Sequence, residues 1–348
     1  MSLPTSTLAY SLKELTGYEK NLVLKESPIG SIGAQEVLVK VHAVSLQYRD
    51  LVVARGSYTA PIAENVVPCS DAACEIIAVG NEVKGWKVGD RVCANFCPDH
   101  VYGPTNEDIN NSALGGQQHG VLTQYRTFPA HSLVRIPDHL SYEEASTLPC
   151  AALTAYNALY GPVPIKAGDF VLVLGTGGVS IFALQFAVAA GATVIATSSS
   201  DEKLKIASKL GAKHLINYNK TPNWHEEVKR VTKGIGAKHV IEVGGAGTLF
   251  KSVKSAKMGD GQVHLIGFVS SEAAESSLVF PIIGGGCTLR GILIGSVAQF
   301  EDMNRLMEAN PEVTRPVIDK VFPFDKAVEA YAYIESQKHV GKVVIKVA

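Results

Sequence analysis

The sequence predicts an α/β protein in which a β-rich part is joined to a doubly wound parallel sheet. Two observations predict this fold class. Short strand-like runs separated by glycine and proline fill residues 1–140, a pattern typical of β-rich domains. From residue 170 onward, strand-like runs alternate with segments of helix length, which is typical of a parallel sheet with helices on both faces. The length of 348 residues fits two domains.

The most informative stretch lies where the alternation begins. The apolar run Val171–Leu174 has the length of a buried parallel strand. Three glycines lie just behind it, and residues 179–190 form an apolar, alanine-rich segment of helix length. A second strand-like run occupies residues 193–197. We therefore expect a strand, a glycine turn, a helix and a second strand, which together make one βαβ unit.

The glycine turn predicts a binding site for a dinucleotide. Glycine lets the backbone bend sharply and approach a ligand, and the N-terminus of the following helix favours a pyrophosphate. The fingerprint of such sites is G-x-G-x-x-G between a strand and a helix, and here Ser180 occupies the third glycine position. The alternative is an ordinary tight turn. The residues expected to hold the pyrophosphate are Gly175, Thr176, Gly177, Gly178 and Val179.

The other elements follow from the same patterns. Strands are expected at 37–44, 74–79, 91–94, 171–174, 193–197, 214–216, 239–243, 262–267, 289–294, 321–324 and 342–347. Helices are expected at 179–190, 201–210, 224–233, 247–256, from 297 onward and at 325–336. The last strand is expected to pair with the first domain.

Two segments carry further expectations. Residues 98–120 are polar, and a loop of that length is either a lid over a site or a surface excursion. Ser141 and Glu144 match a capping box, and we expect the helix that they open to continue to Tyr160 despite Pro149.

Composition excludes some classes of partner. The formal net charge is −1 and 19% of residues are charged, which argues against nucleic acid or an acidic membrane surface. We see no apolar run of membrane-span length and no signal peptide, so we expect a cytoplasmic protein. The six cysteines form no C-x-x-C pair, which is typical of reduced thiols.

Several motifs together resemble one family. They are S-L-Q-Y-R-D-L at 45–51, V-G-N-E-V-K-G-W-K-V-G-D-R-V at 79–92, A-S-T-L-P-C-A-A-L-T-A-Y at 145–156, G-T-G-G-V-S at 175–180, L-R-G-I-L-I-G-S at 289–296 and H-V-G-K-V-V-I at 339–345. The chain resembles the medium-chain dehydrogenase/reductase superfamily, in particular its zinc-free, quinone-oxidoreductase-like branch. The resemblance implies a GroES-like catalytic domain (1–140 and 295–348), a Rossmann domain (141–294) and a cofactor cleft.

The resemblance also bears on metals. Zinc-dependent members bind the catalytic metal through a Cys, the His of a G-H-E motif and a later Cys. The matching residues here are Gln47, Ser70 and Cys150, which do not supply the ligands that zinc needs. Asp71 offers an oxygen one position away. The cysteine quartet of the structural zinc is also missing, so we expect no metal.

For catalysis, the resemblance points to Gln47, Tyr48 and Tyr58 in the segment that lines the active cleft. A tyrosine can donate a proton or stabilise a developing oxyanion, or Tyr48 can instead pack on the cofactor. Relatives often carry Asn where this chain has Gln47. The positions that match the nicotinamide site are Gly267, Phe268, Gly295 and Ser296. We expect the segments 45–60, 98–120 and 268–297 to shape the substrate pocket.

The end of the second strand predicts NADPH over NADH. An enzyme that uses NAD places Asp or Glu there for the ribose hydroxyls, and here the matching residue is Ser198. Ser199 can donate to a phosphate, and Lys203 supplies positive charge. Tyr218 matches a residue that covers the 2′-phosphate in similar reductases. The alternative is that these serines form only an ordinary helix start.

We therefore expect hydride transfer from NADPH to a quinone or an α,β-unsaturated carbonyl compound. Zinc-free interconversion of alcohols and ketones is the second interpretation. A non-catalytic NADPH-binding protein, such as a sensor or a crystallin-like member, is the third. We also expect a homodimer, because the apolar strand at 289–294 ends the sheet and an edge strand can pair with its copy.

Overall fold

The computed structural model describes residues 3–269 and 277–348. These residues form two compact units, which are described separately. The first unit contains both ends of the chain, Met1–Leu153, Ile294–Ala309 and Arg315–Ala348. The second unit contains the middle, Thr154–Leu293 with Asn310–Thr314. Residues 141–153, which the resemblance assigns to the second domain, thus lie in the first unit.

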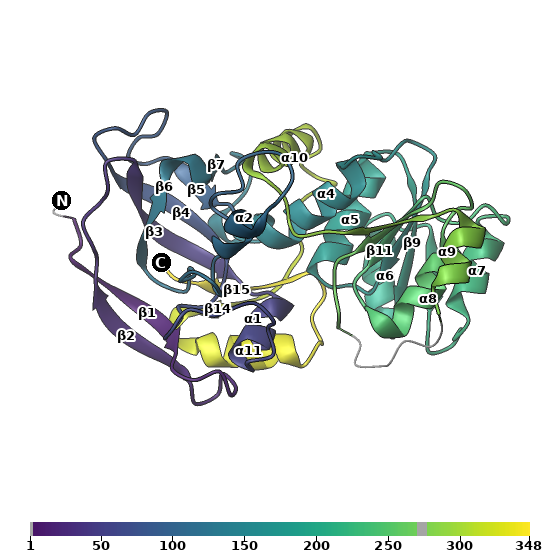
Figure 1. The fold of residues 1–348 in the computed structure, drawn as a ribbon, viewed down its shortest axis with the longest axis horizontal. Helices are drawn as coiled ribbons and strands as arrows, with labels where there is room; N and C mark the ends of the chain where they lie inside the picture. Colours follow the sequence, from purple (N-terminus) through teal and green to yellow (C-terminus); the bar gives the residue numbers. More distant parts are fainter. Residues whose placement is uncertain (1–2, 270–276) are drawn as a thin grey trace. The chain divides into compact units, whose positions relative to one another are not determined.

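The first unit is built on a seven-stranded sheet of the described residues, in the order β14-β15-β3-β4-β5-β7, with β6 paired to β3. The strands are β3 Glu36–Ser45, β4 Asp71–Val79, β5 Arg91–Ala94, β6 Tyr125–Pro129, β7 Leu133–Arg135, β14 Ile318–Pro323 and β15 Lys342–Lys346. Strand β15 pairs antiparallel with β3, Val344 opposite Ser45. The expected pairing of the last strand with the first domain is therefore confirmed (Figure 1, yellow beside purple).

Smaller elements complete this unit. A separate antiparallel pair, β1 Ser6–Leu12 and β2 Leu22–Pro28, was not expected from the sequence. The helices are α1 Tyr48–Ala54, α2 Glu107–Asn111, α3 Tyr142–Ala145, α10 Val297–Ala309 and α11 Ala327–Glu335. The core includes Val37, Val39 and Val41 of β3, which alternate along one face as a half-buried strand requires, and Tyr331 of α11.

The single helix expected from Ser141 to Tyr160 is wrong. The capping box is present, since the Ser141 hydroxyl accepts from Glu144 N at 3.1 Å and Ser141 N donates to the Glu144 carboxylate at 2.8 Å. Helix α3 nevertheless ends at Ala145, a π-helical turn covers Leu148–Ala152, and α4 then runs over Leu153–Tyr160. The reason is Pro149, which has no N–H and whose ring would clash in an α-helix with the carbonyl four residues earlier, that of Ala145, where α3 ends.

The second unit is a six-stranded parallel sheet in the order β10-β9-β8-β11-β12-β13 among the described residues. The strands are β8 Phe170–Leu174, β9 Thr193–Ser198, β10 His214–Asn217, β11 His239–Glu242, β12 Gln262–Leu265 and β13 Thr288–Gly291. The helices between them are α5 Gly178–Ala189, α6 Asp201–Lys209, α7 Trp224–Val231, α8 Ala246–Ser255 and α9 Val279–Gly285. The strand order reverses beside β8, so the doubly wound fold is confirmed.

Two details of this unit differ from the expectation. The strand expected at 289–294 ends at Gly291, and the backbone of Ile294 is left-handed, with a φ of 51°, which no strand can include. Helix α9 was not expected. Of the segment 268–297, which was expected to shape a substrate pocket, residues 270–276 lie outside the described residues.

No helix in the described part of the chain is both long enough and apolar enough to cross a bilayer.

Candidate functional site

The glycine turn of the second unit forms an open cradle between β8 and α5. Gly175 has a φ of +73°, and Gly177 is the N-cap of α5. A Cβ added at either glycine would meet no atom within 4 Å beyond its chain neighbours, so the space beside this backbone is free of protein. The first turn of α5 carries no acidic side chain. Backbone N–H groups and the positive end of the helix dipole therefore lie beside free space, an arrangement that favours the binding of an anion such as a pyrophosphate.

Ser180 is compatible with this turn although the fingerprint has glycine at its position. Its hydroxyl donates to the carbonyl of Leu174 at 2.7 Å, and the residue is buried. The hydroxyl thus ties the first turn of α5 to the end of β8, and it leaves no unsatisfied polar atom. Thr176 is also buried, while Gly178 and Val179 are half-buried.

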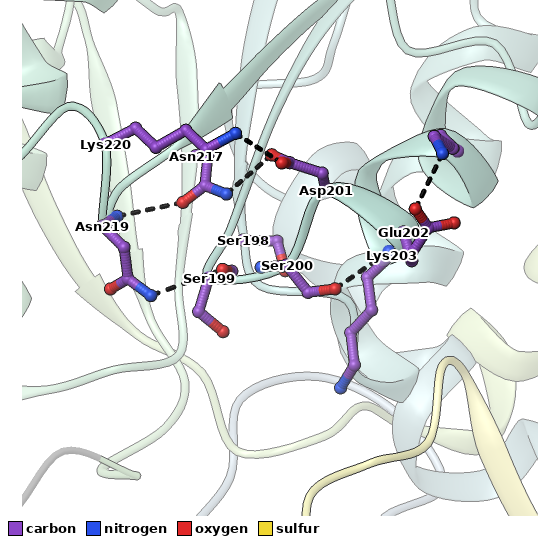
Figure 2. Close-up of polar contacts among 10 residues, drawn as sticks. Ser198, Ser199, Ser200, Asp201, Glu202, Lys203, Asn217, Asn219 and Lys220 are labelled. Atoms are coloured by element: carbon purple, nitrogen blue, oxygen red, sulfur yellow. Dashed lines mark hydrogen bonds and ion pairs between the residues drawn. The ribbon is translucent and has the colours of Figure 1, made fainter.

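The second part of this region is the serine turn at the end of β9. Ser198 is buried, and Ser199 is exposed. Ser200 is the N-cap of α6, its hydroxyl accepting from Lys203 N at 3.4 Å. Tyr218 is 40% exposed, and its backbone N–H donates to the Ser198 carbonyl at 3.1 Å. The fold thus brings Tyr218 beside the serine turn, and in Figure 2 the Ser199 hydroxyl and the Lys203 ammonium extend toward the same side of that turn.

The third part of this unit is the loop after β11, where sequence reasoning missed Glu242. Its buried carboxylate accepts from Gly244 N at 2.7 Å, from Gly245 N at 2.9 Å and from the Thr248 hydroxyl at 2.6 Å. The sequence did contain a signal for this role, because Glu242 lies at the end of a predicted parallel strand and is followed closely by Gly244 and Gly245. The carboxylate fixes the loop beside which the 267–268 backbone lies.

That neighbouring backbone contains two expected cofactor residues. A Cβ at Gly267 would lie 2.4 Å from the Val243 carbonyl, so only glycine fits there. The space at Gly245 is also tight, because a Cβ added there would lie 3.0 Å from the Cα of Phe268. Phe268 is 58% exposed. The ends of β11 and β12 are therefore closely packed where the nicotinamide residues were expected.

In the first unit, Gln47 lies in a buried polar network centred on Asp71. The Gln47 amide donates to Asp71 Oδ2 at 2.5 Å, and the Ser70 hydroxyl donates to Oδ1 at 2.6 Å. The backbone N–H of Cys150 also donates to Oδ2, at 3.0 Å. The three residues at the zinc-ligand positions thus all hydrogen-bond to one carboxylate.

Charged groups surround this network. Lys342 is 3% exposed and donates to the Leu46 carbonyl at 2.6 Å. Burial raises the pKa of Asp71 and lowers that of Lys342, and the attraction between their charges opposes both shifts. Burial also raises the pKa of Asp50 to about 7. One oxygen of Asp50 accepts from Gln47 N at 2.7 Å, and the other has no hydrogen-bond partner.

Arg49 packs on the ring of Tyr58, another of the expected catalytic residues. The guanidinium lies over the Tyr58 ring at 4.7 Å and over the Phe96 ring at 4.8 Å. It also donates to the Leu114 carbonyl at 2.7 Å and to the Gln117 amide oxygen at 3.2 Å. The segment from 114 to 117 is therefore held against α1. Tyr48 begins α1 and is half-buried.

The long polar loop is attached at its base as well. Val297 N donates to the His100 carbonyl at 2.8 Å, and the Asn95 amide donates to the Gly295 carbonyl at 3.2 Å. The hydroxyl of Ser296 accepts from Gln299 N at 3.2 Å, which caps α10. Gly295 and Ser296 therefore have structural roles within the first unit. Sequence reasoning missed Asn95, which carries no local signal.

Comparisons with known proteins agree with this description. Residues 33–138 match the alcohol dehydrogenase GroES-like domain, and residues 178–309 match the zinc-binding dehydrogenase family. A zinc-type alcohol dehydrogenase-like protein of Schizosaccharomyces pombe is 48% identical over 339 residues, which cover 96% of this chain and 97% of that protein. The 2-methylene-furan-3-one reductase of Solanum lycopersicum is 30% identical, over 99% of this chain and 80% of the reductase.

Solved structures show the same likeness. A Sinorhizobium meliloti protein assigned as an alcohol dehydrogenase has a TM-score of 0.92 and 36% identity, covering 99% of this chain and 100% of its own. A 2-octenoyl-CoA carboxylase reductase of Streptomyces, solved with NADP and 2-octenoyl-CoA, has a TM-score of 0.86 and 25% identity, over 99% and 88%. With a 48% identical relative along almost its whole length and both family domains in its two units, the chain belongs to the medium-chain dehydrogenase/reductase superfamily and is an NAD(P)-dependent oxidoreductase.

Proposed function

We propose that this oxidoreductase transfers a hydride from NADPH to a quinone or an α,β-unsaturated carbonyl compound, without a zinc ion. The observation that carries the proposal is the hydrogen bond from Gln47 to Asp71, because it replaces a metal site by a neutral amide and an internally bonded carboxylate. Two relatives support this substrate class, since the names of the tomato reductase and the octenoyl-CoA reductase describe unsaturated substrates.

The residues at the zinc positions do not fit the metal. Zinc binds thiolate, imidazole or carboxylate in a tetrahedron. Burial raises the pKa of the Cys150 thiol, so the thiolate is disfavoured, and both oxygens of Asp71 already accept hydrogen bonds. No group of three or more His, Cys, Asp or Glu side chains within residues 3–269 and 277–348 is placed to hold a metal ion.

A zinc-free site favours conjugated acceptors for a chemical reason. Bound NADPH supplies the hydride. When hydride reaches a conjugated carbon, the negative charge spreads onto the carbonyl oxygen, and hydrogen-bond donors suffice to stabilise that charge. We propose Gln47, Tyr48 and Tyr58 for binding and orienting the acceptor, with a tyrosine as proton donor.

We assign the cofactor residues of the second unit as follows. The turn at 175–179 holds the pyrophosphate, and Gly267 with Phe268 holds the nicotinamide. Gly295 and Ser296 of the first unit are also proposed as cofactor-binding residues. Ser198, Ser199, Lys203 and Tyr218 hold the 2′-phosphate, because the turn offers hydroxyls and an ammonium group at the position where NAD enzymes carry an acid.

An assay tests the cofactor preference. Lys203→Ala is expected to weaken NADPH binding by about 1.5–3 kcal/mol, the value of a charge-assisted phosphate contact, and to leave NADH nearly unchanged. Equal losses for both cofactors, or tighter NADH binding by the unmodified protein, would count against NADPH.

Two other functions stay open to test. The second candidate is zinc-free interconversion of alcohols and ketones. The name of the Schizosaccharomyces pombe relative, a zinc-type alcohol dehydrogenase-like protein, supports the alcohol dehydrogenase activity but not the absence of zinc. A nucleotide-binding protein without catalysis is the third candidate. The experiment mixes the protein with NADPH and a panel of quinones, enals and ketones and follows the absorbance of the cofactor. Oxidation by quinones or enals supports the proposal, oxidation by simple ketones supports the second function, and binding without oxidation supports the third.

We also propose a homodimer that forms through β13. This strand is an edge of the parallel sheet, and neighbouring α9 exposes Val279, Phe280 and Ile283 at 59%, 83% and 72%. An unpaired edge beside exposed apolar side chains favours pairing with a copy. A monomeric mass in sedimentation at micromolar concentration would contradict it. We propose a cytoplasmic location, which the six free thiols support.

A further inference from the structure

Two carboxylates follow the serine turn, and both are bound by lysines. Asp201 and Glu202 are the first residues of α6. A carboxylate near a phosphate repels it, so Asp201 works against the NADPH preference proposed above, whereas the Glu202 side chain is 78% exposed and its charge is screened by solvent. Glu202 forms an ion pair with Lys205 at 2.7 Å on the same helix. Asp201 is held by residues from a different element.

The partners of Asp201 come from the last residue of β10 and from the turn that follows it. The Asn217 amide donates to Asp201 Oδ1 at 2.7 Å, and the Lys220 ammonium donates to Oδ2 at 2.5 Å. Figure 2 shows the Asp201 carboxylate directed toward these two side chains and away from Lys203. Hydrogen bonds from Lys220 and then Asn217 lower the pKa of Asp201, so the carboxylate is ionised and paired near neutral pH.

The geometry of the two turns fixes the orientation of Asn217. Strands β9 and β10 are parallel neighbours, with Asn217 opposite Ser198. The Asn217 side-chain oxygen accepts from Asn219 N at 3.1 Å, which leaves its NH₂ group to face Asp201. The Asn219 amide donates to the Ser199 carbonyl at 3.4 Å. The turn after β10 is therefore bonded both to the serine turn and to the acid that follows it.

We propose that Asn217 and Lys220 are positioning residues that set the cofactor preference by holding Asp201 away from the 2′-phosphate position and pairing its charge. The inference rests on the proposed use of NADPH and adds two determinants that lie about twenty residues beyond the usual specificity position. Lys203 contacts the phosphate in this scheme, whereas Lys220 acts only through Asp201. With Lys220 removed, the carboxylate repels a phosphate dianion but still accepts hydrogen bonds from ribose hydroxyls.

The test is a double-mutant cycle between Lys220 and Asp201, with dissociation constants for NADPH and NADH measured by fluorescence titration. Lys220→Met is expected to weaken NADPH about 5–10-fold and to leave NADH within about twofold, an effect typical of one nearby charge. Asp201→Asn is expected to restore NADPH affinity in the Lys220→Met background. Asn217→Ala is expected to act in the same direction as Lys220→Met, with a smaller effect.

Matched variants separate positioning from a general effect of charge. Lys205→Met removes the same charge from an equally exposed lysine, 66% against 67%, and is expected to change the NADPH to NADH ratio less than twofold. Lys220→Arg keeps the ion pair and is expected to retain the wild-type ratio. Both lysines are exposed, so the variants are expected to fold normally, and the ratio serves as an internal control.

Three results would overturn the inference. A loss of NADPH affinity that persists in the Lys220→Met, Asp201→Asn double variant means that Lys220 contacts the cofactor directly. An equal loss for Lys205→Met means that only net charge matters. If the wild-type protein prefers NADPH, either of these results disproves the role of Asn217 and Lys220 but leaves the proposed function intact. If the wild-type protein prefers NADH, both the inference and the proposed use of NADPH are disproved.

Discussion

The side-chain amide of Gln47 donates to Oδ2 of Asp71 at 2.5 Å, and both residues are buried. These positions are 24 residues apart in the chain. The bond commits the carboxylate to an internal polar network, and Lys342 supplies the opposite charge. Because a buried charge is costly unless it is paired, the network is expected to respond strongly to loss of its cation.

Lys342→Met is expected to lower the free energy of unfolding of the first unit by about 3 kcal/mol, because Asp71 would stay buried without a counter-charge. Urea denaturation followed by circular dichroism measures the change. Lys346→Met in the same strand is the control, since Lys346 is 57% exposed in its ion pair with Glu143, and such a pair contributes at most about 1 kcal/mol. Similar losses for both variants would disprove the buried-pair explanation.

Gly177→Ala is expected to weaken NADPH and NADH at least about tenfold, because the second glycine of the fingerprint lets the backbone approach the pyrophosphate. The fold is expected to tolerate the change within about 1 kcal/mol, the usual range for an N-cap substitution, since a Cβ there meets no protein atom within 4 Å. Gly267→Ala is the contrast, because its Cβ would meet the Val243 carbonyl at 2.4 Å. Calorimetric titration and thermal unfolding separate the effects. Unchanged cofactor affinity in Gly177→Ala would exclude the turn as the pyrophosphate site.

Arg49→Met is expected to release the segment from 114 to 117 and to raise its rate of limited proteolysis about tenfold, since charge-assisted hydrogen bonds are each worth about 1.5–3 kcal/mol. If the segment borders the substrate, KM for the acceptor rises more than kcat falls. The control is Arg55→Met, at the C-cap of the same helix. It removes an ion pair with Glu335 in which the arginine side chain is 41% exposed, and it is expected to leave the cleavage rate unchanged. Unaltered proteolysis in Arg49→Met would show that other contacts hold the segment.

The second unit is expected to lose stability in acid because of two buried histidines. His239 Nδ1 and His264 Nε2 lie 3.0 Å apart, and the other ring nitrogen of each has no hydrogen-bond partner. Burial lowers the pKa of His239 to about 4 and of His264 to about 3. Between those values and the unfolded pKa of about 6.5, the unfolded chain binds more protons than the folded chain.

Stability is therefore complete above about pH 6.5 and falls as the pH decreases toward 4, by up to about 1.4 kcal/mol per pH unit for each histidine. Thermal unfolding between pH 7.5 and 4.5 measures the slope. His264→Leu is expected to flatten the profile, while His131→Gln, at a site 51% exposed, is expected to leave it unchanged. An equally steep profile in His264→Leu would assign the acid lability to other groups.

Local patterns in the sequence were enough to predict the parallel sheet and its glycine turn. Strand length, glycine positions and helix periodicity are local properties, so Val171–Leu174 and the turn behind it could be identified without a fold. The presence of Gln47 and Ser70 at the positions where zinc-dependent relatives carry Cys and His could be read from residue identity once the resemblance had aligned them. The capping box at Ser141 was also visible, but the π-helical turn at Pro149 was not, because the path of a helix past proline depends on what packs around it.

Tertiary structure alone decided which of these residues meet. Lys342 donates to the Leu46 carbonyl across 296 residues of sequence, and Arg49 reaches Leu114 across 65. No local pattern encodes such contacts. The first arises because strands from both ends of the chain pair in one sheet, and the second joins helix α1 to a distant loop. The same holds for Asp201, whose sequence position places it beside the serine turn, and whose side chain is directed away from Lys203 by Lys220 on the neighbouring strand's turn. Residue type determined the available charges, and chain packing determined which of them are paired.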